Sequence, residues 1–393
     1  MDEEVLICLA AAAAAIYVVS QYWNEHEFEA YYGDGGKALY TQLLLNARPD
    51  LFKEIARMER ETFDKLVLEL SSYGLLEDGR SVSVEEQVLI FLDIVCHNNA
   101  MRQTAVKFRR GLYTVTRYFG LVLEGLVALY PIYVRFNLDS CAQPHKISRN
   151  PKYAAFKNCL GALDGVFVPA RVPLDMQCNY RSRKGIISQN ILAAVNFNFE
   201  FVYVLAGWEG SAHDTRVFND ATSKALKIPG NKYFLADAGY GLRKGLMTPY
   251  RAVRYHLKEQ AAAGLRPKNK KELYNLQHAT LRNIVERIFG CIKKKFPILQ
   301  VAPEVELRKQ VRLIYALVML WNFMRKHESV ENMFEEYSDQ DAAAYRAAAE
   351  AEADDPLPTT AQEDNYMKFR RNRLADKLWD QFKAYKAQQR TTN

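Results

Sequence analysis

Two aspartates in otherwise apolar strands restrict what this chain can fold into more than any other feature of its sequence. Asp164 lies inside the apolar segment CLGALDGVFV, and Asp237 ends a second such segment, KYFLAD. Leaving an unpaired carboxylate in such a strand costs several kcal/mol, so each aspartate needs a positive partner. That partner is either an arginine in a salt bridge or a divalent cation.

A third acid, Glu286, lies on a long amphipathic helix predicted over residues 271–296. In an ideal helix its side chain points away from the apolar stripe, beside Arg282 and Lys293. Taken alone, Glu286 would form an exposed i,i+4 ion pair with Arg282. Taken with the two strand acids, it completes a set of hard oxygen ligands that suits a site for two divalent cations.

The charge is distributed unevenly along the 393 residues. Residues 144–300 contain 26 Lys and Arg but only 10 Asp and Glu, whereas the whole chain has a net charge of +7. The rest of the chain is therefore acidic overall. Such a basic segment indicates a polyanionic partner, and a solvated basic surface without a special role is the alternative.

Cysteine usage and hydropathy exclude several other classes of protein. The six cysteines are scattered without a CxxC pair, which argues against a zinc site or a disulfide framework and indicates a reducing compartment. The longest apolar run, residues 5–19, is short for a membrane span and follows the acidic start MDEE. We interpret residues 1–37 as a hydrophobic N-terminal helix with its lead-in. We expect no stable membrane association, with a weak anchor as the alternative.

The first predicted folded region, residues 38–142, is all-α. Ser83 to Glu86 form a capping box before an apolar helix. Residues 102–129 predict a short helix, a turn at Arg110–Gly111 and a longer helix, which together would make a helix-turn-helix. If this unit binds DNA, Arg109, Arg110 and Arg117 should share one exposed face. Packing without DNA contact is the equal alternative.

The second predicted region, residues 143–330, changes to strands. Four apolar segments alternate with helical crossovers, and a hairpin is expected at residues 196–198. This order favours a mixed α/β domain. Residues 331–364 are rich in alanine and acids and predict a flexible linker, and residues 365–393 form a basic tail.

Several segments closely resemble the Harbinger-type (PIF/Harbinger) transposases and their domesticated nuclease relatives. In order, they are CLGALDG, RKGIISQNILAAVNFNFEFVYVLAGWEGSAHDTRVF, YFLADAGYGLRKGLMTPYRAVRYHLKE and LRNIVERIFGCIKKKFPIL. The likeness runs from about Leu43 to Arg325. It implies an RNase H-like mixed-sheet nuclease domain with a DDE acid triad, which maps to Asp164, Asp237 and Glu286. It also implies Mg²⁺ or Mn²⁺ as cofactor.

The resemblance adds further candidate site residues. Asp214, in SAHDTRVF, would be a fourth metal ligand, although Ser211 to Asp214 also form a capping-box arrangement. Basic residues near the acids would contact the DNA backbone. They are Arg181, Arg183, Lys184, Arg243, Lys244, Arg251, Arg254, Arg282 and Lys293.

These observations favour a metal-dependent DNA endonuclease or transposase that hydrolyses phosphodiester bonds and, as a transposase, rejoins them. The resemblance implies a nuclear protein with DNA and a Myb/SANT-like protein as partners, the latter aiding nuclear import, and it leaves a homo-oligomer open. A domesticated DNA-binding or scaffold protein without transposition is the main alternative. An RNA-directed RNase H-like enzyme fits the fold class but not the motifs. The intact acid set favours the nuclease.

Overall fold

The computed structural model describes residues 38–182, 185–253, 267–335, 337–338, 340–342 and 364–392. The chain divides into two compact units, one ending at Val122 and the other beginning at Leu123. The predicted N-terminal hydrophobic helix and most of the predicted linker lie outside the described residues.

The first unit is helical, as the sequence predicts. Its central helix, α5 (Val84–His97), is buried along nearly its whole length, and the Ser83 hydroxyl caps it by accepting a hydrogen bond from the Glu86 N–H at 3.4 Å. The other helices are α2 (Leu39–Leu45), α3 (Pro49–Ala56), α4 (Arg60–Ser72), α6 (Met101–Lys107) and α7 (Leu112–Tyr133), which continues into the second unit. By length and composition α7 could cross a bilayer, but nearly half of it is buried inside the protein.

The turn between α6 and α7 does not present Arg110 to solvent. Arg110 Nε donates to Glu86 Oε1 at 2.5 Å and Nη2 donates to Glu86 Oε2 at 3.0 Å. The two side chains are only 5% and 2% exposed. The expectation that Arg110 shares an exposed DNA-facing surface with Arg117 is therefore wrong, because the buried Glu86 carboxylate requires a cation. Arg117 itself is exposed.

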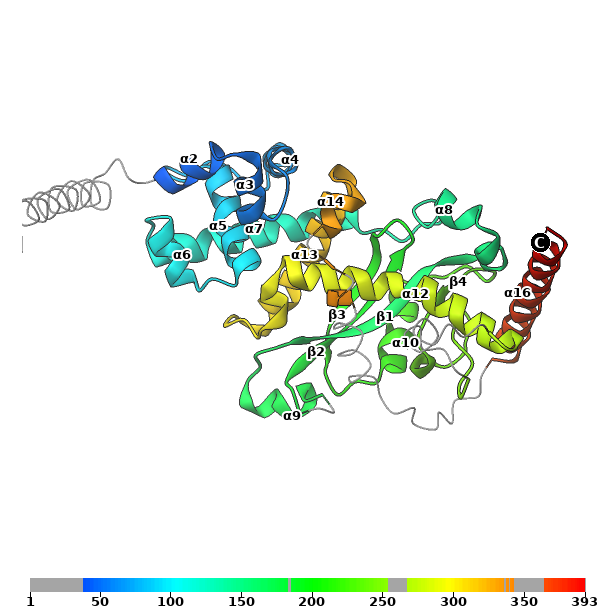
Figure 1. The fold of residues 1–393 in the computed structure, drawn as a ribbon. Coiled ribbons are helices and arrows are strands. Elements are labelled where there is room, and N and C mark those ends of the chain that lie inside the picture. The colour runs from blue at the N-terminus through cyan, green and yellow to red at the C-terminus, as the bar shows by residue number, and fades with distance from the viewer. Residues whose placement is uncertain are drawn as a thin grey trace, which may run out of the picture. The chain divides into compact units, whose positions relative to one another are not determined.

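The second unit is built on a five-stranded mixed sheet in the order β3-β2-β1-β4-β5 (Figure 1). β1 (Cys159–Pro169) pairs antiparallel with β2 (Ser188–Asn196), which pairs antiparallel with β3 (Phe201–Glu209). β4 (Tyr233–Leu235) is parallel to β1, and β5 (Leu246–Met247) is parallel to β4. The predicted mixed α/β class is confirmed, and the sheet is consistent with an RNase H-like fold. β5 was not predicted, since two residues give no periodic pattern.

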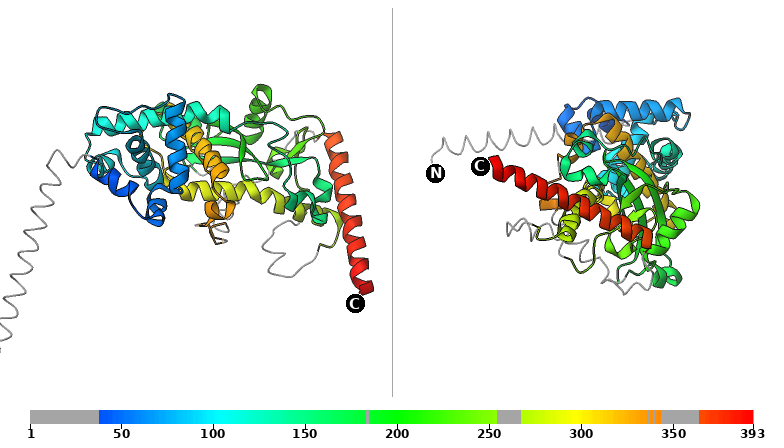
Figure 2. Two further views of the ribbon diagram at one scale, coloured as in Figure 1. Left: turned by 90° about the horizontal axis from the view of Figure 1, so that it is seen from above. Right: turned by 90° about the vertical axis from the view of Figure 1, so that its right-hand side faces the viewer.

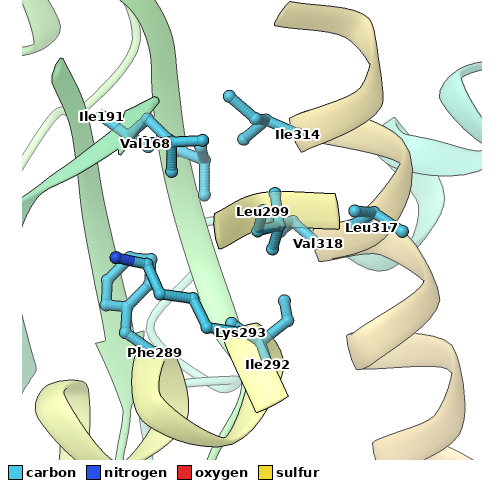
Figure 3. A pocket seen from close by; sticks show the side chains of 10 residues that line it. Val168, Ile191, Phe289, Ile292, Lys293, Leu299, Ile314, Leu317 and Val318 are labelled. Carbon is cyan, nitrogen blue, oxygen red and sulfur yellow. The ribbon is translucent and has the colours of Figure 1, made fainter. Parts of the chain in front are cut away.

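Helices cover both faces of the sheet, and strand alternation decides which side chains each face receives. On one face α10 (Asp214–Lys224) packs Val217 and Phe218 against Leu163 and Leu192. On the other face lie α12 (Lys270–Lys295) and α13 (Leu307–His327). Between these two helices and the sheet is an apolar pocket (Figure 3); the residues that line it are Val168, Ile191, Val204, Phe289, Ile292, Lys293, Leu299, Ile314, Leu317 and Val318.

Short elements and the C-terminal helix complete the second unit. The short ones are α8 (His145–Ser148), η2 (Pro151–Phe156), η3 (Leu174–Met176), α9 (Gln177–Tyr180), η4 (Ala238–Tyr240), η5 (Pro297–Gln300) and α14 (Val330–Phe334). α14 buries Met333 and Phe334, so the folded part extends beyond residue 330. The C-terminal tail forms a long helix, α16 (Asn365–Thr392), at one edge of the unit (Figure 2).

The first half of α16 packs against the segment that follows β5. Arg371 is buried, stacks 4.3 Å above the Tyr250 ring and donates to the Pro249 carbonyl at 3.1 Å. Asn275 of α12 binds both the N–H and the carbonyl of Tyr250. Two helices therefore hold the segment around Tyr250, which leads away from β5.

Candidate active site

The carboxylate of Asp164 meets α12 through one arginine. Arg282 Nη1 donates to Asp164 Oδ2 at 2.7 Å, and Nη2 donates to Glu286 Oε1 at 2.5 Å. The three side chains are only 14–21% exposed. The i,i+4 pair considered from the sequence therefore exists, but it faces the sheet instead of solvent, because Asp164 lies on the α12 side of β1.

The positive charge of Arg282 does not fully offset the cost of burying the Asp164 carboxylate. Burial raises the pKa of the Asp164 carboxyl to about 7, and the positive charge of Arg282 opposes that rise. The charges of Asp237, Glu286 and Asp214 raise the same pKa further. The other three predicted acids thus all act on the Asp164 carboxyl group, although they come from different parts of the fold.

Asp214 approaches from the opposite face of the sheet. It is the first residue of α10, and its Oδ1 accepts a hydrogen bond from Asn190 Nδ2 at 3.0 Å. The helix is capped by His213, whose Nδ1 accepts from the Thr215 N–H at 3.2 Å. A Cβ atom on Gly165 would lie 2.8 Å from Asp214 Oδ1, so only glycine beside Asp164 allows this approach.

Asp237 follows β4 by two residues and caps the short helix η4, accepting a weak hydrogen bond from the Gly239 N–H at 3.4 Å. Tyr240, at the end of η4, is 1% exposed. Its hydroxyl has no hydrogen-bond partner among the residues that the structure describes. Burial, with the charges of Asp214, Asp164 and Asp237, raises the pKa of the Tyr240 phenol well above its ordinary value. The phenol therefore stays a proton donor beside the acids.

Sequence reasoning did not single out Tyr240. The signal available was its position three residues after Asp237 in ADAGYG, where an aromatic side chain follows an acid, an alanine and a glycine. An aromatic residue there is compatible with simple core packing, and the ring does pack against Phe218 of α10.

The predicted basic residues lie in several different environments. Arg251 is exposed and donates from Nη2 to the carbonyl of Ala238, the residue after Asp237, at 2.7 Å. Arg243 donates to Asn219 Oδ1 at 3.1 Å, and Lys244 is exposed. Arg181 is exposed and donates to the Gly185 carbonyl at 3.1 Å.

Two other predicted DNA contacts point into the protein. Arg282 binds the two acids described above, and Lys293 donates to the Phe167 carbonyl at 3.1 Å while lining the pocket of Figure 3. Arg183, Lys184 and Arg254 lie outside the described residues.

Comparison with known proteins agrees with this geometry. Residues 163–322 match the family profile described as DDE superfamily endonuclease, and residues 36–128 match a domain of unknown function, DUF8040. The chain carries a DDE superfamily endonuclease domain. The resemblance to Harbinger-type transposase-derived nucleases is thereby confirmed.

The chain is also similar to proteins of animals and plants. It is 24% identical over 259 residues to human "Putative nuclease HARBI1", covering 63% of this chain and 69% of the relative, and the rat protein of that name gives the same values. It is 21% identical over 229 residues to "Protein ALP1-like" of Arabidopsis thaliana, covering 51% of this chain and 55% of the relative. No solved structure gives a significant match.

The donor chemistry of the four acids suits a hard divalent cation of the kind that DDE endonucleases generally use. Burial, together with the three neighbouring acids, raises the pKa of Asp164, and a bound cation would favour its ionised form instead. No group of three His, Cys, Asp or Glu side chains in the described part of the chain is arranged to hold a metal ion. Arg282 lies between two of the candidate ligands instead.

The raised pKa of Asp164 predicts how stability depends on pH in metal-free buffer. The carboxyl titrates near 4 in the unfolded chain but at about 7 in the folded one, so the folded state holds an extra proton between these values. Relative to Asp164→Asn, the native chain should lose on the order of 3 kcal/mol of stability as pH rises from about 4 to about 7. Urea unfolding of both chains at a series of pH values measures this difference, and a difference that does not change with pH would contradict it. The exposed Asp175, changed to Asn, is the control.

The close approach at Gly165 predicts the effect of adding one methyl group. Gly165→Ala should destabilise the second unit by roughly 1–3 kcal/mol, because its Cβ would overlap the Asp214 carboxylate and press on the Tyr240 hydroxyl at 3.1 Å. Gly120→Ala, a helical glycine with open space around it, should be neutral or slightly stabilising. Thermal unfolding of both variants provides the comparison, and equal behaviour would mean that Asp214 does not approach β1 in this way.

Proposed function

We propose that the second unit is a divalent-metal-dependent DNA nuclease of the DDE type, which hydrolyses phosphodiester bonds. The observation that carries the proposal is the convergence of three acids, Asp214, Asp237 and Glu286, on the largely buried carboxyl of Asp164 inside a DDE endonuclease domain. Buried acids gathered in this way raise one another's pKa and cost stability, which is typical of functional sites.

In this proposal Asp164, Asp237 and Glu286 hold the metal ions, and Asp214 is a fourth ligand. When bound, two such cations activate the attacking water or 3′-hydroxyl and stabilise the leaving oxygen. The chain's own contribution is position. β1 and α12 face Asp164 towards Glu286, Asn190 orients Asp214 at 3.0 Å, and the buried Tyr240 ring excludes water from the α10 side.

The DNA backbone would be held by the exposed cations near the acids. Arg251 is the strongest candidate, because its contact with Ala238 places it beside Asp237. Lys244 and Arg181 are exposed and could extend the contact along the DNA backbone. The basic character of residues 144–300 supports a polyanionic substrate. A Myb/SANT-like protein partner, a homo-oligomer and a nuclear location belong to the same proposal.

One observation favours a second candidate, a domesticated DNA-binding or scaffold protein. Arg282 already forms ion pairs with two of the three triad acids, so part of the negative charge is balanced without any metal. A protein that retained the fold but not the chemistry could keep its acids in this form.

Cleavage of DNA that carries terminal inverted repeats separates the two candidates. With Mn²⁺, the native chain should cleave, and both Asp237→Asn and Glu286→Gln should lower the rate by roughly 100-fold or more, because each removes one ligand charge. Asp175→Asn, at an exposed acid away from the cluster, should cleave like the native chain.

Three other results would be informative. Equal cleavage by all variants would point to a contaminating enzyme. Cleavage in excess chelator would contradict the metal dependence. Tight DNA binding without cleavage, even with a Myb-like partner added, would favour the scaffold.

A further inference from the structure

Arg282 binds one carboxylate oxygen of each of two proposed metal ligands, Asp164 and Glu286. Its guanidinium binds Asp164 Oδ2 at 2.7 Å and Glu286 Oε1 at 2.5 Å. The other oxygen of Asp164, Oδ1, accepts a hydrogen bond from the Gly165 N–H at 3.0 Å. Both oxygens of Asp164 therefore already have a donor, and the stronger of the two donors is a full positive charge.

The charge of Arg282 cannot be removed by a change in pH. A guanidinium stays protonated at every pH at which a protein is folded, so it leaves a carboxylate only by moving. A divalent cation at the same carboxylates would be repelled by the guanidinium at close range, where the surroundings screen charge poorly. The arginine and the ion are therefore alternative partners of the same two acids.

We propose that Arg282 is an internal counter-ion that competes with the divalent metal for Asp164 and Glu286. This rests on the proposed function of the acids as metal ligands. While no metal is bound, Arg282 holds the two carboxylates together across the gap between β1 and α12 and offsets their repulsion. Metal binding requires it to withdraw from at least one of them. The free energy of metal binding is therefore the difference between the metal–carboxylate and the arginine–carboxylate interactions.

The neighbouring Arg287 provides a matched control on the same helix. Its guanidinium lies over the rings of Phe199 and Phe334, at 5.4 and 5.1 Å, and among the described residues it forms no ion pair with the acids. Changing it to Gln removes the same charge from α12 without removing the competitor. The pair of variants separates local competition from a general change in electrostatic potential.

The test is calorimetric titration of the full chain with Mn²⁺ in the absence of DNA. Arg282→Gln should bind Mn²⁺ at least about tenfold more tightly than the native chain, because the competitor is gone. Arg287→Gln and the charge-preserving Arg282→Lys should stay within roughly threefold of the native value. Asp237→Asn should bind more weakly than native, which locates the ion at the acids.

Thermal unfolding gives a second measurement on the same samples. Without metal, Arg282→Gln should melt below the native chain, since it leaves buried carboxylates without their cation. Saturating Mn²⁺ should raise its melting temperature by more than it raises that of the native chain. If Arg282→Gln does not fold without metal, Arg282→Met, which fills similar space without charge, is measured in its place.

The outcomes distinguish this inference from the function on which it rests. Equal or weaker Mn²⁺ binding by Arg282→Gln, with binding still lost in Asp237→Asn, would overturn the competition and leave the metal site intact. Two results would overturn both the proposed metal site and the competition. One is the absence of Mn²⁺ binding in every variant, and the other is Mn²⁺ binding that Asp237→Asn does not weaken.

Discussion

Burial of the Asp164 carboxylate is the constraint on which the site depends. Strand alternation turns it towards α12, where the i,i+4 pair Arg282 and Glu286 lies against it. The next residue, Gly165, has no side chain, so Asp214 reaches the strand from the opposite face. Asp237 joins from the turn after β4. Acids from both faces of the sheet and from the turn after β4 thus act on one largely buried carboxylate.

Most of the fold and the identity of the acids were accessible from the sequence. The four longer strands read as apolar segments and the long helices of the second unit have apolar stripes, so an acid inside such a segment is visible without a structure. Asp164 and Asp237 were conspicuous for this reason. Glu286 joined them through its position on the cationic face of a long helix, although alone it fits an exposed ion pair. The resemblance to Harbinger-type proteins then added Asp214, whose local pattern alone fits a helix cap.

Contacts between distant residues could not be read in the same way. The sequence around Arg110 predicts an exposed turn. Only the fold shows that Arg110 forms a salt bridge with Glu86, which is buried in α5. Tyr240 lies in a short turn where helical and strand periods carry no information. Arg282 was predicted to contact DNA because it is basic and near an acid. Its orientation towards Asp164 depends on how α12 packs on β1, which no local pattern specifies.

Crystals grown with Mn²⁺ and measured for anomalous scattering test the central claim most directly, because they locate the ion without relying on activity. The account predicts an anomalous peak within coordination distance of oxygens from Asp164, Asp237 and Glu286, with the Arg282 guanidinium withdrawn from at least one of its two acids. A fully Mn²⁺-loaded crystal with no peak at these acids, and with Arg282 still bridging Asp164 and Glu286, would contradict it.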